Sequence, residues 1–177
     1  MDKILKKAIK GDKDAFIKVM QSMEKKIYII AKAKLSNEED IKDVIQETIY
    51  KSYKNIKDLK DTSKFENWII SILINNCNQV YRNKKNIIHI EYNENEVDNL
   101  ETNSEYIKSE ENIDFFRFLE LLDEIEKEIF ILFYSNDYTT KQISEILNIN
   151  ENTIKTKLKR ARQKIKEYIE RWDRYGT

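Results

Sequence analysis

Apolar residues recur at intervals of three and four residues along most of the chain, with polar residues between them. This spacing is typical of helices that bury one side. The chain contains no proline and only two glycines, Gly11 and Gly176, so few residues oppose helix formation. The sequence therefore predicts an all-α fold. In the N-terminal half, the positions expected in the core are Ala15, Phe16, Val19, Met20, Met23, Ile27, Ile30, Ala31, Leu35, Ile41, Val44, Ile45, Ile49, Tyr53, Ile56, Phe65, Trp68, Ile69, Ile72, Leu73, Val80 and Tyr81.

The helical pattern stops in one internal stretch, which separates two blocks. Between Ile87 and Asp114, nine acidic residues face a single basic residue, Lys108, and no apolar stripe is present. A segment of this composition buries too little apolar surface to become ordered by itself. We therefore predict two small helical domains, residues 1–86 and 113–177, joined by a flexible acidic linker at residues 87–112.

Residues 137–166 contain two short helical patterns that are separated by a three-residue break. The first pattern, TTKQISEIL, places its isoleucines and leucine on one side of a helix. Asn148 ends it, because asparagine tolerates the left-handed conformation that the corner of a helix-turn-helix needs. Asn150 is a suitable N-cap for the second pattern. The segment therefore predicts a C-terminal helix-turn-helix, whose second helix enters the major groove of DNA.

The second helix of this motif is amphipathic and strongly basic. Ile154, Leu158, Ala161 and Ile165 form its apolar stripe, and its lysines and arginines lie off that stripe. Polar residues in its first turns suit base edges, and the cations suit phosphates. The alternative is a surface helix with solvated charges, but the cations are almost unopposed from residue 152 to residue 166. The residues expected to contact DNA are Asn152, Thr153, Lys155, Thr156, Lys159 and Arg160.

A polar stripe marks the segment DVIQETIYKSY. Asp43, Gln46, Glu47 and Tyr50 fall at i, i+3, i+4 and i+7, which is one side of the expected helix. A stripe with acids at its centre suits docking to a basic partner. The alternative is a solvated helix face with charge pairs such as Glu47 with Lys51.

Composition limits the other classes of function. The chain has 32 basic and 32 acidic residues, but their uneven placement leaves nucleic-acid binding open. Cys77 and His89 are each the only residue of their type, so neither an intrachain disulfide nor a Cys/His zinc site can form. No cofactor motif, catalytic pair or metal-spaced carboxylate set stands out, and we expect no cofactor and no enzymatic activity. The N-terminus does not resemble a signal peptide, and no apolar run approaches the roughly 18 residues of a membrane span. We therefore expect a cytoplasmic protein without direct membrane insertion.

The order of these segments resembles the sigma-70 family of bacterial RNA polymerase initiation factors. Within that family it is similar to the small two-domain group called extracytoplasmic function, or ECF, sigma factors. A DxxQE helix at Asp43, Gln46 and Glu47 carries the first part of the resemblance. A TxKxxLxRAR-like helix that starts at Thr153 carries the second part. The two motifs stand in the order that the family has.

The chain departs from the family at three places. Asp123 stands where proline is common, and Asn148 stands where glycine is common. Both residues suit their positions, because aspartate is a strong N-cap and asparagine tolerates the left-handed turn. The basic tail of the N-terminal block holds only Arg82, Lys84 and Lys85, which indicates fewer phosphate contacts there.

The resemblance implies an alternative sigma factor that binds core RNA polymerase and directs it to promoter DNA. The stripe from Asp43 to Tyr50 would bind the polymerase, and the recognition helix would read the -35 element. The acidic linker would run through the polymerase channel that RNA uses. An anti-sigma factor is a further implied partner.

The resemblance also implies that the segment from residue 57 to residue 82 opens the -10 element. In the family, a loop and the helix after it hold flipped bases, which requires polar edges, apolar walls and nearby cations. The residues that offer such groups here are Asp61, Ser63, Lys64, Asn67, Asn75, Asn76, Asn78 and Arg82, of which Asn75 matches a frequent family asparagine.

Local signals in the same region predict structural roles as well. Ser63 with Glu66 has the spacing of a capping box at the start of a helix. Trp68 is expected to be a core anchor, and a stacking platform for a base is the alternative. The tyrosines at positions 50, 53, 81, 134 and 138 are expected in the core or at its boundary.

Two other classes of function fit the same motifs. One is a stand-alone helix-turn-helix transcription regulator with the N-terminal block as a sensing or dimerisation domain. The other is a nucleic-acid-processing enzyme that uses the motif only to bind. Stoichiometric binding to core polymerase distinguishes a sigma factor from both.

Overall fold

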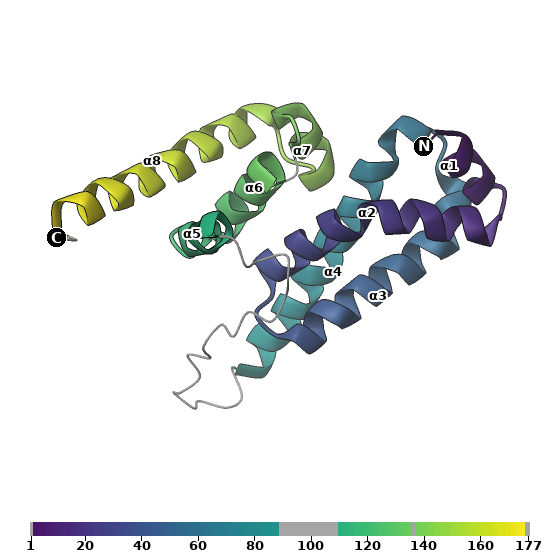
Figure 1. Cartoon of the computed structure of the whole chain (residues 1–177), viewed down its shortest axis with the longest axis horizontal. Helices are drawn as coiled ribbons and strands as arrows, with labels where there is room; N and C mark the ends of the chain where they lie inside the picture. The colour runs from purple at the N-terminus through teal and green to yellow at the C-terminus, as the bar shows by residue number, and fades with distance from the viewer. Residues whose placement is uncertain (1, 89–109, 136, 176–177) are drawn as a thin grey trace. The chain divides into compact units, whose positions relative to one another are not determined.

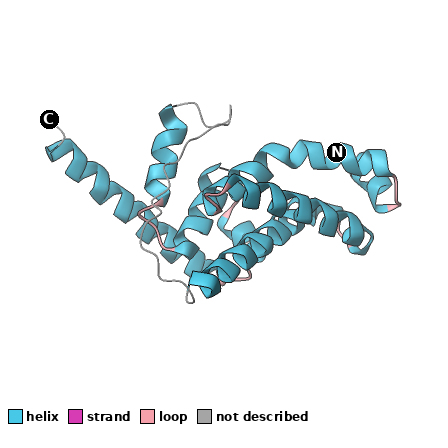
Figure 2. Ribbon diagram, turned by 90° about the horizontal axis from the view of Figure 1, so that it is seen from below, coloured by secondary structure: helices cyan, strands magenta, loops and turns pink. Residues whose placement is uncertain are grey.

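The computed structural model describes residues 2–88, 110–135 and 137–175. These residues form helices joined by short loops, with no strand among them, as Figures 1 and 2 show. The all-α prediction is therefore confirmed for the described part of the chain. The chain divides into two compact units, residues 1–96 and 97–177, and each unit is described by itself.

The first unit is built on three long helices that pack against one another. They are α2 (Lys13–Lys34), α3 (Glu38–Asn55) and α4 (Phe65–Ile88), and the shorter α1 (Asp2–Ile9) packs on α2. Two 3-10 turns, η1 (Ile56–Asp58) and η2 (Thr62–Lys64), connect α3 to α4. Asp12 caps α2, and Asn37 caps α3 by accepting from two backbone N–H groups.

The core of this unit contains most of the predicted apolar positions, but α3 differs. Ile49 and Tyr53 were expected in the core, yet their exposed fractions are 38% and 43%. Thr48 and Ser52 are instead fully buried. Small side chains there allow close helix packing, and each hydroxyl donates to a carbonyl four residues earlier, at 2.7 Å from Thr48 and 2.6 Å from Ser52. Because both hydroxyl donors are satisfied, their burial carries little penalty.

The start of α4 also differs from the prediction. Ser63 lies inside the η2 turn, and its hydroxyl donates to the Asp61 carboxylate at 2.7 Å. Asp61 is the capping residue, because it accepts the Ser63 backbone N–H at 2.9 Å. Glu66 forms an ion pair with Lys26 of α2 at 2.8 Å. The expected Ser63–Glu66 capping box is therefore wrong, because the backbone N–H and the hydroxyl of Ser63 are both bonded to Asp61, which caps the η2 turn.

The tyrosines expected in the core or at its boundary are, with one exception, well exposed to solvent. Tyr50 is 60% exposed, and Tyr81 and Tyr134 are 46% and 45% exposed. Only Tyr138 of the five tyrosines is buried, at 4%. Trp68 is half-buried, and its ring centroid lies 6.2 Å from that of Phe65. This partial burial does not decide between a core anchor and a stacking platform.

The second unit contains the predicted helix-turn-helix. Its helices are α5 (Glu110–Leu119), α6 (Glu124–Ser135), α7 (Thr140–Leu147) and α8 (Glu151–Tyr175). Helices α6 and α7 both pack on α8, and apart from Glu126 and Glu128 the buried residues of this unit are aliphatic or aromatic. Thr139 and Gln142 form a reciprocal capping box at the start of α7.

The corner between α7 and α8 has the predicted form. Asn148 is left-handed, with φ 53° and ψ 45°, and its backbone N–H donates to the Ser144 carbonyl. The Asn150 side chain accepts the Asn152 backbone N–H at 2.9 Å, so Asn150 caps α8. Both predictions are confirmed, because each depends on a local interaction that one residue type satisfies best.

The ends of the predicted linker lie in helices. Helix α4 continues to Ile88 and α5 starts at Glu110, so both enter the range 87–112. Residues 89–109, which include His89, lie outside the described residues. The domain limits at residues 86 and 113 remain a prediction.

The left-handed corner gives a test of local stability. Replacing Asn148 with alanine places a side chain without local hydrogen bonds in a conformation that costs an ordinary L-residue about 1 kcal/mol. We expect Asn148→Ala to lower the free energy of unfolding by about that amount, and Asn148→Gly to have little effect. Amide hydrogen exchange in α7 and α8 of the full chain measures this difference. Equal protection in both variants would contradict a conformational role for Asn148.

Candidate nucleic-acid and partner interfaces

The solvent side of α3 carries the four residues predicted to bind a partner. Asp43, Gln46, Glu47 and Tyr50 are all exposed, while Ile41 and Val44 on the other side of the helix are buried. The Glu47 carboxylate lies 3.2 Å from the Lys51 ammonium, the pair that the alternative interpretation anticipated. The four residues therefore form one continuous polar face, called the α3 face below.

Two apolar residues extend the α3 face. Ile49 and Tyr53 are exposed beside Tyr50, and the sequence interpretation missed them because it assigned them to the core. The Tyr53 ring meets the Phe16 ring of α2 edge-on, with ring centroids 5.1 Å apart. A face of acids next to apolar rings matches an amphipathic partner with basic and apolar positions.

One side of α4 gathers four of the residues predicted to face -10 DNA. Asn67, Asn75, Asn78 and Arg82 lie at i, i+8, i+11 and i+15, which a 3.6-residue period places on one side. Asn75 and Arg82 are exposed, and Asn67 and Asn78 are half-buried. These residues are called the α4 face below.

The turn before α4 presents three more residues of this set. Asp61, Ser63 and Lys64 are all exposed. Hydrogen bonds from the Ser63 hydroxyl and the Ser63 backbone N–H hold the pKa of the Asp61 carboxyl below its usual value. The Thr62 hydroxyl of the same turn donates to the Asp2 carboxylate of α1 at 2.8 Å, so the first helix helps to hold this turn.

Asn76 does not lie on the α4 face. Its side chain points to the opposite side of α4, is only 5% exposed, and is hydrogen-bonded to Thr48 and Lys51 of α3. A side chain in this position cannot reach a base, so the structure corrects the prediction that Asn76 contacts DNA. Helical periodicity separates Asn75 from Asn76, and the sequence interpretation had grouped the two by residue type alone.

The exposed side of α8 carries all six residues predicted to read the -35 element. Asn152, Thr153, Lys155, Thr156, Lys159 and Arg160 are exposed, and Ile154, Leu158, Ala161 and Ile165 are buried on the other side. These six residues are called the α8 face below. Among the described residues, Lys159 and Arg160 form no ion pair.

A carboxylate stands at the start of the α8 face. Glu151 forms an ion pair with Lys155 at 2.9 Å and accepts from the Thr140 hydroxyl of α7 at 2.8 Å. Hydrogen bonds from Lys155 and then Thr140 hold the pKa of the Glu151 carboxyl below its usual value. The first turn of α8 is thus fixed to α7 by a polar contact that leaves the asparagine and threonines exposed.

Three cations of α8 bind α6 instead of facing solvent freely. Lys157 pairs with Asp123 at 3.0 Å, and Lys164 pairs with Glu126 at 2.5 Å. Asp123 and Glu126 form the capping box of α6, at 2.8 Å and 3.2 Å. The sequence interpretation had counted these lysines among the cations suited to phosphates. They hold α8 against the start of α6.

Arg162 makes the third such contact. Its Nε donates to the Tyr134 hydroxyl at 2.6 Å, and its guanidinium lies 5.2 Å from the centre of the Phe133 ring. This contact joins α8 to the C-terminal end of α6. Helix α8 is therefore attached to α6 by polar contacts at both ends of α6, in addition to its apolar stripe.

The described residues contain no group of histidine, cysteine, aspartate and glutamate side chains that could hold a metal ion. In the same part of the chain, every helix is too short or too polar to cross a membrane.

Comparisons with known proteins place both units in one family. The family model described as Sigma-70 region 2 matches residues 19–87, and the one described as Sigma-70, region 4 matches residues 114–165. The chain is 27% identical over 186 residues to the ECF RNA polymerase sigma factor SigW of Bacillus subtilis, covering 96% of this chain and 98% of SigW. It is 29% identical over 140 residues to the RNA polymerase sigma factor SigV of the same species, covering 76% of this chain and 78% of SigV.

A solved structure shares the fold. It is the sigma factor RpoE from Bartonella quintana in complex with the anti-sigma factor NepR. The TM-score is 0.72 at 19% identity, and the match covers 86% of this chain and 97% of that chain.

The contact between Asp123 and α8 predicts a dependence of stability on pH. Partial burial raises the pKa of the Asp123 carboxyl, but the Glu126 backbone N–H and the Lys157 ammonium outweigh it, so the pKa lies below its usual value. A carboxyl with a lowered pKa stabilises the fold above its unfolded-state pKa, and that contribution is lost as the pH falls through the folded value. We expect the stabilisation to be complete above about pH 5 and to be lost progressively as the pH falls below about 4 and through the lowered folded value.

Asp123→Ser provides the matched variant, because serine also caps helices but does not titrate. We expect the stability difference between the wild type and Asp123→Ser, measured by urea unfolding, to shrink as the pH falls from 6 to 3. A difference that stays constant over this range would show that the carboxylate charge does not hold α8.

Proposed function

Because this chain belongs to the ECF group of the sigma-70 family, we propose that it docks on polymerase through the α3 face and contacts promoter DNA through the α4 and α8 faces. It is an alternative sigma factor, which binds core RNA polymerase and directs transcription initiation. The catalytic chemistry then belongs to core polymerase. The proposal places its action in the cytoplasm, where core polymerase and chromosomal DNA are found.

The exposure of the whole α8 face is the observation that carries this proposal. Six polar or basic residues share the solvent side of a helix whose other side is buried against α6 and α7. The N-terminal turns offer amide and hydroxyl groups to base edges, and Lys159 and Arg160 offer cations to the backbone. This division is what a recognition helix in the major groove requires.

The proposed docking contact is electrostatic as well as apolar. Asp43 and Glu47 place two acids on the α3 face, and Ile49, Tyr50 and Tyr53 place exposed apolar surface beside them. Burying the rings against a partner gives affinity, and the acids select a basic partner. The coiled-coil-like clamp helices of core polymerase are the proposed partner.

The proposed -10 contact combines the α4 face with the turn before it. Asparagine amides both donate and accept hydrogen bonds, so they suit the edges of bases that have left the stack. Lys64 and Arg82 are exposed near the two ends of this surface and suit phosphates. Trp68, half-buried behind the start of the helix, leaves part of its ring available to solvent.

An anti-sigma factor is a proposed partner as well. The similar solved structure of RpoE contains the anti-sigma factor NepR. In our proposal such a factor would cover the α3 face or the DNA-contacting faces and so prevent both kinds of binding.

Reconstitution with core polymerase tests the function. The purified chain should bind core stoichiometrically and start transcription from a short promoter, and core alone should not. A chain that binds DNA specifically without core, as a dimer, would instead be a stand-alone regulator. Turnover of a nucleic acid in the absence of core would identify a processing enzyme.

Charge reversal tests the docking face. The variant Asp43→Lys/Glu47→Lys should lose core affinity by on the order of 2 kcal/mol or more, because like charges would then face a basic partner. Helicity should not change, since both residues are exposed. The control is Asp14→Lys/Glu24→Lys, which reverses two exposed acids of α2. Normal affinity of the first variant in a core pull-down would refute the assignment.

Two substitutions on α8 separate phosphate contact from base reading. Lys159→Ala should weaken binding to all DNA sequences and reduce the slope of log affinity against log salt by about one unit. Asn152→Ala should change the preference among -35 variants at a cost of about 1 to 3 kcal/mol per lost base contact. Transcription from a set of -35 variants, with core binding measured in parallel, checks both. Unchanged preference and unchanged salt slope would show that α8 does not contact promoter DNA.

A further inference from the structure

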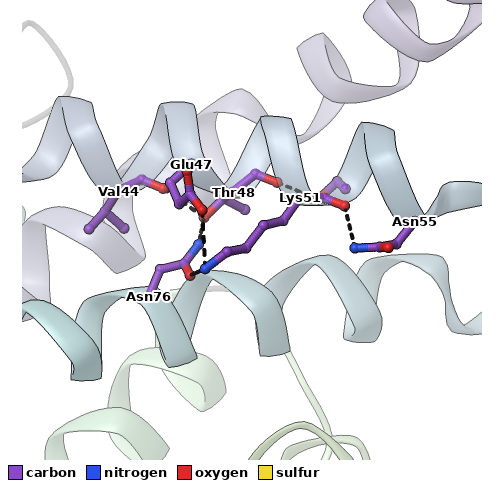
Figure 3. A network of polar contacts seen from close by, with 7 residues as sticks. Val44, Glu47, Thr48, Lys51, Asn55 and Asn76 are labelled. Atoms are coloured by element: carbon purple, nitrogen blue, oxygen red, sulfur yellow. Dashed lines mark hydrogen bonds and ion pairs between the residues drawn. The ribbon is translucent and has the colours of Figure 1, made fainter.

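A chain of hydrogen bonds joins α3 to α4 beneath the α3 face, and Figure 3 shows its members. Asn76 of α4 is 5% exposed, and its amide nitrogen donates to the Thr48 hydroxyl oxygen at 2.9 Å. The Thr48 hydroxyl in turn donates to the Val44 backbone carbonyl at 2.7 Å. Both side chains are therefore satisfied in a position with almost no access to water.

These bonds fix the orientation of the Asn76 amide. A threonine hydroxyl has one proton, and Thr48 gives it to Val44, so Thr48 can only accept from Asn76. Asn76 must then turn its NH₂ group toward Thr48, which leaves its carbonyl oxygen for a donor. That donor is the Lys51 ammonium, 2.7 Å from the Asn76 oxygen.

The same ammonium reaches the α3 face. Lys51 lies 2.7 Å from Asn76 and 3.2 Å from the Glu47 carboxylate, so it bridges a buried amide and an exposed acid. A lysine on a helix surface ordinarily moves among many rotamers. Here a buried partner that cannot turn away holds its end, and the ammonium is held beside Glu47.

We propose that Asn76 and Lys51 are positioning residues that set the pose of Glu47 for docking on core polymerase. The inference rests on the proposed docking role of the α3 face. A carboxylate that is already held in place loses less side-chain freedom when a partner binds. In this arrangement Asn76, a buried residue of α4, controls the affinity with which α3 binds core polymerase.

The test is a double-mutant cycle on core binding. Asn76→Leu keeps a side chain of similar volume and leaves no donor unsatisfied, because Thr48 still donates to Val44. In the wild-type background it should weaken core binding between about twofold and tenfold, the lower part of the range of coupling within one hydrogen-bond network. In a Glu47→Gln background it should have no further effect. Asn83→Leu, an exposed position of the same helix, is the control and should leave core binding unchanged.

Lys51→Met approaches the same contact from the exposed end. It removes the ammonium and should reproduce the loss seen with Asn76→Leu, again only when Glu47 is present. Circular dichroism checks whether Asn76→Leu folds. If it does not fold, Lys51→Met provides the test instead.

The possible outcomes separate the two levels of the proposal. If Glu47→Gln alone leaves core binding unchanged, the docking role of Glu47 fails, and the positioning role fails with it. If Glu47→Gln weakens binding while the Asn76 and Lys51 variants have no effect, or have equal effects in both backgrounds, docking stands and the positioning role is overturned. Equal losses in both backgrounds would mean that the network supports only the packing of α3 on α4.

Discussion

Burial of one side of each helix is the constraint on which the functional faces depend. Helix α8 has no exposed surface at Ile154 and Ala161, and Leu158 is only 4% exposed. Burying an aliphatic side chain of this size contributes about 1.5 to 3 kcal/mol, so rotating α8 about its axis would lose several such contributions. The rotation of the helix is therefore fixed, and with it the side on which Asn152, Lys159 and their neighbours stand. The same reasoning applies to α3, where burial of Ile41 and Val44 leaves Asp43 and Glu47 exposed.

Charged residues on α8 fall into two groups that the sequence alone does not separate. Lys157 and Lys164 pair with the capping box of α6, whereas Lys159 and Arg160 are exposed and form no ion pair among the described residues. The first pair lies closer to the apolar stripe, where a lysine stem can pack and its ammonium can reach α6. The acids that bind these lysines lie about thirty or more positions earlier in the chain. Only some of the cations of α8 are therefore available to an external partner. The others stabilise the packing of α8 on α6.

Local signals made much of the fold predictable from the sequence. Asn148 and Asn150 each act within a few residues of their own position, so residue type and spacing were sufficient. Contacts between distant segments were not predictable in this way. Two sides of α3 could have faced the core. One side carries the apolar residues Ile49 and Tyr53, and a neighbouring side carries Thr48 and Ser52. Close packing on α4 favours the small side chains, and the local sequence pattern of α3 does not predict the distance between α3 and α4.

Asn75 and Asn76 show why residue type alone could not assign the candidate site. The two are chemically identical, but successive residues of a helix differ by about 100° in direction, so one is exposed and the other is buried. The exposed amide remains available for an external partner. The buried amide must satisfy its donors and acceptor inside the protein, and Thr48 and Lys51 are the groups that do so. A single helix can therefore expose one asparagine to solvent and hold α3 with the next, and only the packing of α4 decides which asparagine does which.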